Sequence, residues 1–198
     1  ITSFDLVVDE TFICEGESVQ IDATTETVVW SDNFDPNISL GDWDDINNGA
    51  SSATCGSVSG SALYFTGTGE RSATTNAIDV SMGGTIFFSI KIANGIAPCD
   101  NAEPGDNVEL RYSTDGVTFP AGNTIMIFNE SAYPDFTDLA IEIPAGALTN
   151  STKFRWIQVG AWAGNQDNWC IDEVYIATNS QGNFTYDWVS NPTGNFTS

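Results

Sequence analysis

The feature that most constrains the fold is a regular succession of short β-strand patterns between residues 28 and 177. Runs of β-branched and aromatic residues alternate with polar ones and are separated by turn signals, such as the hairpin signal Thr114-Asp115-Gly116. The run Thr85–Ile92 is apolar on both faces for part of its length, which predicts a central strand. No window combines helical periodicity with good caps. The pattern therefore predicts an all-β fold, an antiparallel jelly-roll or β-sandwich.

Charge excludes several classes of function. Among 198 residues, 27 are acidic, five are basic and none is His, which makes the formal net charge −22. Such a chain repels nucleic acid and anionic membrane surfaces, and it suits hard cations that bind carboxylate and carbonyl oxygens. The missing His excludes a Ser-His-Asp or Cys-His catalytic site. Because of this charge we expect no nucleic-acid partner. No stretch approaches the length of a transmembrane helix, so we also expect no insertion into a membrane.

Four cysteines indicate where the protein resides. Their even number, together with few Lys and a surface rich in Asn, Thr and Gly, favours an oxidising, extracellular or cell-surface location. The first residues, 1–8, lack the basic and long apolar regions of a signal peptide, so we expect the chain to begin after processing or inside a longer protein.

One carboxylate lies in an apolar strand near the end of the chain. In the run 165–176, strict alternation places Cys170, Asp172 and Val174 on one face and Trp169 on the other. If this is a core strand, Asp172 is buried among apolar neighbours. A buried carboxylate must be paired, hydrogen-bonded or bound to a metal, and cations are scarce in this chain. Asp172 is therefore a candidate metal ligand.

The two ends of the chain resemble pieces of one unit. Residues 12–22, with Cys14 before Gly16 and Val19, and the alternating Phe184 to Trp188 resemble the immunoglobulin-like repeats of surface proteins from Bacteroidetes-type bacteria. This resemblance predicts a partial immunoglobulin-like unit made of residues 1–28 and 178–198, with a jelly-roll domain, 29–177, inserted between its strands. The alternative is that both ends are outer strands of the central domain.

Residues 31–176 resemble the jelly-roll subrepeat of reelin, a large extracellular matrix protein, and its bacterial relatives. The resemblance rests on an ordered set of motifs: Gly60-Ser61-Ala62-Leu63-Tyr64-Phe65, Val108-Glu109-Leu110-Arg111-Tyr112-Ser113, Phe154-Arg155-Trp156, and Asp167 followed by Trp169, Ile171 and Asp172. Most of these are fold positions, and a shared fold does not by itself carry function.

The resemblance implies a structural Ca2+ where the first and last strands lie side by side. The matching residues are Asp32 and Asp35 near the first strand and Asp172 on the last, with backbone carbonyls completing the six to eight oxygens that Ca2+ takes. The alternative for Asp32 and Asp35 is that they only shape a loop, as Asp often does.

The resemblance also implies a disulfide between Cys55 and Cys99. Cys170 stands where a small residue is usual in the family, and Cys is small and apolar enough for a core. A bridge from Cys14 to Cys170 and a buried free thiol at Cys170 are both compatible with the spacing.

The five cations, Arg71 among them, are expected to form structural ion pairs with the abundant acids; a bound anion at Arg71 is the alternative. We expect a non-catalytic adhesion or display module of a large secreted bacterial surface protein, stabilised by Ca2+. Its partners would be other domains of the same protein and a protein or glycan surface ligand.

The alternative function is a carbohydrate-binding module of a secreted enzyme. Such a module would stack sugars on exposed aromatic residues, and the candidates are Trp43, Tyr133, Trp162 and Trp188. A glycosidase is a third possibility, for which the sequence offers no carboxylate pair at a defined spacing.

Overall fold

The structure is a computed structural model, and it describes residues 4–8, 21–129, 132–158, 164 and 166–180. None of the helices in these ranges is long and apolar enough to cross a membrane. The two helices in the described residues are single 3-10 turns, Ala121–Asn123 (η1) and Ala145–Ala147 (η2).

The strands form two antiparallel sheets. Sheet A has seven strands: β1 (Phe4–Val8), β2 (Ile21–Asp32), β4 (Gly49–Ser52), β5 (Ala62–Phe65), β7 (Gly84–Ile92), β10 (Thr137–Glu142) and β12 (Trp169–Ser180). Sheet B has five strands in the order β3 (Trp43–Asn47), β6 (Arg71–Thr75), β11 (Lys153–Gln158), β8 (Val108–Ser113) and β9 (Thr124–Phe128). The predicted all-β antiparallel sandwich is therefore confirmed.

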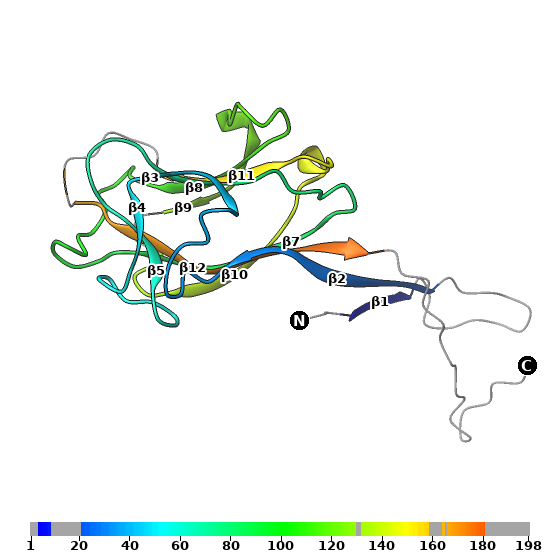
Figure 1. Cartoon of the computed structure of the whole chain (residues 1–198), viewed down its shortest axis with the longest axis horizontal. Helices are drawn as coiled ribbons and strands as arrows, with labels where there is room; N and C mark the ends of the chain where they lie inside the picture. Colours follow the sequence, from blue (N-terminus) through cyan, green and yellow to red (C-terminus); the bar gives the residue numbers. More distant parts are fainter. Residues whose placement is uncertain (1–3, 9–20, 130–131, 159–163, 165, 181–198) are drawn as a thin grey trace, which may run out of the picture.

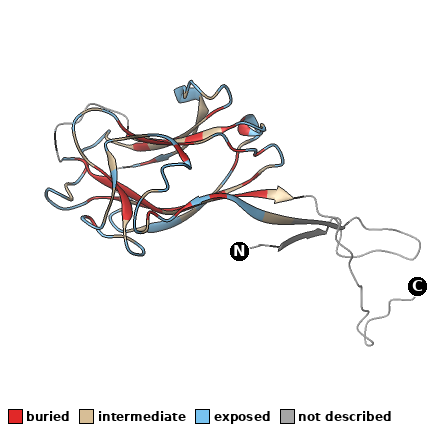
Figure 2. Cartoon of the chain, in the orientation of Figure 1, coloured by how far each residue is buried: buried red, intermediate tan, exposed pale blue. Residues whose placement is uncertain are grey.

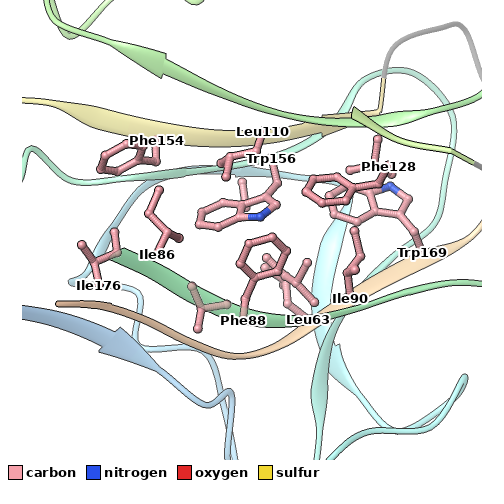
Figure 3. Packing of buried hydrophobic residues seen from close by; sticks show 14 of the residues in the cluster. Leu63, Ile86, Phe88, Ile90, Leu110, Phe128, Phe154, Trp156, Trp169 and Ile176 are labelled. Carbon is pink, nitrogen blue, oxygen red and sulfur yellow. The ribbon is translucent and has the colours of Figure 1, made fainter. Parts of the chain in front are cut away.

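The two sheets pack face to face, with buried residues lining the space between them (Figures 1 and 2). Alternation produces this arrangement: in β11, Phe154 and Trp156 are buried and their neighbours are half-exposed. The Trp156 ring contacts Phe88 from sheet A edge-on, with ring centroids 5.4 Å apart. Figure 3 shows Phe154, Trp156 and Leu110 from sheet B opposite Ile86, Phe88 and Ile176 from sheet A.

Strand β12 is the centre of sheet A. It pairs with β7 along one edge, and with β5 and then β2 along the other. Residues Trp169 and Ile171 lie in the core, and so do Val174 and Ile176. Between them the pairing with β7 shifts by one residue, and Glu173 has a φ of +49°. This is a β-bulge, in which one extra residue reverses the side on which the following side chains emerge.

The bulge corrects the expectation of strict alternation in this strand. Cys170 and Asp172 do share a face, but Val174 points to the opposite face, into the sandwich. Asp172 therefore emerges on the outer face of sheet A.

A small second cluster covers that outer face. Cys170 and Tyr64 pack there beneath the disulfide between Cys55 and Cys99, whose Cα atoms are 5.4 Å apart. The Tyr64 hydroxyl donates to the Pro98 carbonyl at 2.5 Å, which holds the Cys99 loop against the sheet. The disulfide implied by the family resemblance is present. Among the described residues Cys170 is a buried free thiol, and the alternative bridge would involve Cys14, which lies outside the described residues.

Both ends of the sandwich domain continue across the expected domain boundaries. β2 runs through residues 28 and 29, and β12 runs through 177 and 178, with pairing maintained from Val28–Ala177 to Thr25–Ser180. β1 extends the same sheet by pairing with the start of β2 (Figure 1). The residues behind the immunoglobulin-like expectation, Cys14 and 184–188, lie outside the described residues, so that domain division stays a prediction.

Candidate metal centres

Asp172 is a fully buried carboxylate held by backbone N–H groups. Its Oδ2 accepts from the Val58 N–H at 2.7 Å, and its Oδ1 accepts from the Glu173 N–H at 2.8 Å. Burial raises the pKa of Asp172, the N–H groups of Val58, Glu173 and Ser59 oppose this rise, and the Glu173 charge adds to it. Each carboxylate oxygen keeps a further lone pair, so Asp172 can accept from the loop and still bind a cation.

Asp35, which lies early in the sequence, binds the same loop as Asp172. Its Oδ1 accepts from the Ser61 N–H at 2.6 Å. Gly60, with a φ of +51°, lies so close that an added Cβ would collide with the Asp35 carboxylate. In the segment Val58–Ser61, the first N–H group thus donates to Asp172 and the last donates to Asp35. The structure brings these two predicted ligands to one short loop between β4 and β5.

Asp32 has a different environment. It is 4% exposed and pairs with the core residue Val174, so its side chain lies on the core side of sheet A. Its Oδ1 accepts from the Phe34 N–H at 2.8 Å, and its Oδ2 accepts from the Ser39 N–H at 2.9 Å and the Trp43 Nε1–H at 2.8 Å. Asp32 therefore organises the turn that presents Asp35, and it lies on the opposite face of sheet A from Asp172.

A second group of carboxylates was not singled out from the sequence. One oxygen from each of Glu103, Asp106 and Asp167 lies within 4.8 Å of the other two. Asp167 is 6% exposed, and its Oδ1 is buried without a hydrogen-bond partner. Burial and the neighbouring Glu103 and Asp106 raise the pKa of Asp167 to about 7, against the lowering effect of Arg71. These three residues could hold a metal ion.

Sequence reasoning missed this group because its members come from two loops 60 or more residues apart. Glu103 and Asp106 follow β7, and Asp167 precedes β12. The one sequence feature that pointed to this group was Asp167, which is part of the reelin-like motif and was interpreted as a fold position.

The buried Arg71 positions Asp167. Its guanidinium donates to the carbonyl oxygens of Gly67, Gly164, Gln166 and Asp167 and to Oε1 of Gln158, at 2.7 to 3.2 Å. Burial lowers its pKa and the Asp167 charge opposes this, but a guanidinium stays protonated. Arg71 therefore has a structural role through backbone carbonyls and one amide oxygen, and the ion pair expected for it stays a prediction.

Other cations do form ion pairs. Lys153 Nζ lies 2.8 Å from Asp44 Oδ2, and Arg111 Nε lies 2.8 Å from Glu109 Oε2. Arg155 stacks over Phe119, 4.0 Å from the ring centroid.

Cys170 is the free thiol in the described part of the chain, and it is unsuited to be a nucleophile. Burial raises its pKa to about 12, with Lys91 opposing and Asp172 adding to the rise.

Fold and site together define a class: a disulfide-bonded β-sandwich module with buried carboxylates in its strands and in the loop before β12. Residues 48–177 match the family model of Reelin subrepeat B, and the chain belongs to this family. The match confirms the reelin-like resemblance for that range.

The sandwich is also similar to solved carbohydrate-binding modules. "Xylan-Binding Domain from CBM 22, formally x6b domain" is 13% identical with a TM-score of 0.49, and the similarity covers 76% of this chain and 94% of that one. "Family 16 Carbohydrate Binding Module-2" is 11% identical with a TM-score of 0.43, over 68% of this chain and 89% of that one. These likenesses are too distant to assign a ligand to the chain.

Proposed function

We propose that the chain is a non-catalytic adhesion or display module of a large secreted bacterial surface protein, stabilised outside the cell by Ca2+. The observation that carries the calcium part is that Asp35 and Asp172 both accept from N–H groups of one loop, Val58–Ser61. Membership in the reelin subrepeat B family supports the modular, extracellular part, and so does the Cys55–Cys99 disulfide.

In this proposal Asp35 and Asp172 are the carboxylate ligands, and carbonyl oxygens of the Val58–Ser61 loop supply further oxygens. Bound Ca2+ would neutralise two carboxylates and tie the start of the domain to its last strand. Asp32 contributes indirectly, because its three hydrogen bonds hold the turn that carries Asp35. The backbone N–H bonds to Asp35 and Asp172 keep both side chains in place before an ion arrives.

The carbohydrate-binding alternative has less support from the surface. Trp43 is buried in the core, and Tyr133 is half-buried against it; Trp162 and Trp188 lie outside the described residues. The exposed large apolar residues of the described chain are aliphatic residues and Met82, and none is aromatic. A row of exposed rings for sugar stacking is therefore absent from the described surface.

One hollow on the outer face of sheet A keeps a glycan among the possible surface ligands. Phe87 and Tyr175 stack there, with ring centroids 4.6 Å apart and planes 13° apart. Val58, Asp138 and Glu173 line the same hollow. A sugar could stack on this half-buried pair while the carboxylates accept from its hydroxyl groups.

Thermal unfolding tests the calcium proposal. With Ca2+ at about one hundred times its Kd, binding to the folded state contributes about 2.7 kcal/mol, a rise of about 5–11 °C in Tm relative to chelator. Asp172→Asn should lose part or all of this rise. Asp42→Asn, which removes one charge from an exposed side chain, is the matched control and should keep it. Full retention of the calcium effect by Asp172→Asn contradicts the proposed ligands.

A glycan array separates the two functions. Under the adhesion proposal, binding to oligosaccharides should not depend on the Phe87–Tyr175 pair. Saturable binding to a defined polysaccharide that Phe87→Ala abolishes, with Tm unchanged, would favour the carbohydrate-binding alternative.

A further inference from the structure

We propose that Glu103, Asp106 and Asp167 form a second Ca2+ site that fastens the β7–β8 loop to the entry of β12. The site is separate from the Asp35 and Asp172 loop, and it does not depend on the function proposed above. It would take one hard divalent cation, with carboxylates from both loops as ligands.

The two loops are already held in register beside the site. The Asp100 N–H donates to Oδ1 of Asn168 at 3.0 Å, and the Asn168 N–H donates to the Asp100 carbonyl at 3.2 Å. Asn168 is fully buried, and its side chain also donates to the Phe65 carbonyl at 3.3 Å. The backbone therefore brings Glu103 and Asp106 to the neighbour of Asn168, which is Asp167.

The conformation of Asp167 turns its side chain toward the two other acids. Its φ is +53°, in the left-handed region that non-glycine residues seldom adopt. Its carbonyl accepts from Arg71 Nη1 at 2.7 Å and from Gln158 Nε2 at 3.0 Å, which holds the backbone in this conformation. The cationic side chain nearest to Asp167 thus binds the backbone, while the carboxylate faces Glu103 and Asp106.

An unpartnered oxygen points to a missing ligand in the cluster. Asp167 is 6% exposed, and its Oδ1 is buried with no hydrogen-bond partner. Buried polar atoms in native proteins are normally satisfied by protein, water or an ion. Three carboxylates that converge here repel one another, so a divalent cation satisfies both the oxygen and the charge.

Ligand type favours Ca2+ over Mg2+. The site offers three carboxylates, whose oxygens lie within 4.8 Å of one another. Ca2+ accepts several carboxylates and bidentate binding, whereas Mg2+ usually keeps several waters. The exposed side of Glu103 leaves room for water to complete the calcium shell.

The test compares the double variant Glu103→Gln/Asp106→Asn with the wild-type chain in calorimetric titrations with Ca2+. Both side chains lie at the surface or half-buried, so the substitution leaves the core intact. Asp135→Asn/Glu142→Gln removes the same charge from exposed positions and is the matched control. We expect the double variant to bind one Ca2+ fewer per chain, or to bind it at least tenfold more weakly, and the control to bind as the wild type does.

Amide hydrogen exchange provides a local readout. Ca2+ should slow exchange at Asp100 and Asn168 in the wild type and in Asp172→Asn, but not in Glu103→Gln/Asp106→Asn. Unchanged calcium stoichiometry and affinity in Glu103→Gln/Asp106→Asn would overturn the proposal. So would tighter binding of Mg2+ than of Ca2+, or protection lost in Asp172→Asn instead.

Discussion

Replacing Arg71 by Met should be among the most destabilising single changes in the domain. The variant keeps the length and apolar stem of the side chain and removes the guanidinium. Arg71 is fully buried, and its five N–H groups make six donor–acceptor contacts with five oxygens, on Gly67, Gln158, Gly164, Gln166 and Asp167.

The loss in the free energy of unfolding depends on which of these oxygens water can reach in the variant. The bonds to Gln158 and Asp167 are buried, whereas those to Gly67, Gly164 and Gln166 are partly buried. Each buried acceptor left without a donor costs about 1–3 kcal/mol, and water offsets much of the loss at the others. Asp167 retains its bond from Gln158, so we expect a total of about 3–5 kcal/mol. That is a large share of the ~5–15 kcal/mol by which a domain is usually stable.

Urea unfolding followed by tryptophan fluorescence measures this loss. The transition midpoint should fall, and the slope of free energy against urea should stay constant. Arg155→Met is the matched control: Arg155 is half-buried, stacks on Phe119 and donates to Oγ1 of Thr74, so its loss should cost about 1 kcal/mol. Arg71→Lys should recover little, because an ammonium cannot span five oxygens. A loss below about 1 kcal/mol for Arg71→Met would refute the view that this side chain holds the loop before β12.

Two further predictions concern the disulfide and a turn. Cys55→Ser/Cys99→Ser should lower the free energy of unfolding by about 4 kcal/mol, because the bond closes a loop with a sequence separation of 44; equal urea midpoints with and without the bond would contradict this. The Thr118 hydroxyl, the N–H groups of Thr118 and Val117 and the Ser113 hydroxyl donate to Asp115, and these bonds hold its pKa well below its usual range. Because the folded-state pKa is depressed, the stabilisation is present above the ordinary pKa of about 4 and is lost as the pH falls through the folded-state pKa. Asp115→Ala should therefore lower Tm at neutral pH by more than at about pH 2 in circular-dichroism melts, and an equal difference at both pH values would count against this role.

The strands of the sandwich follow from the sequence because their cause is local. In β11 the alternation of Phe154 and Trp156 with polar residues requires one face to be buried, whatever the partner strand is. The family motifs added the pairing of Cys55 with Cys99, which residue spacing alone leaves open.

The sites depended on tertiary structure. Periodicity placed Asp172 and Val174 on one face, and the bulge at Glu173, set by its pairing with β7, separated them. Asp35 and Asp172 come to one loop because each accepts from an N–H group of the loop before β5, although the two residues are far apart in the chain.

The sequence by itself determined that this protein is acidic and all-β, because alternation, turn residues and charge are properties of neighbouring residues. Its reelin-like kind was indicated by the resemblance of its ordered motifs to that family. Only the tertiary structure decided where carboxylates gather. Asp167 is a candidate metal ligand because folding brings its carboxylate beside Glu103 and Asp106, while Arg71 binds its backbone carbonyl. The burial of such a carboxylate and the charge around it depend on several segments, which the chain brings together only when it folds.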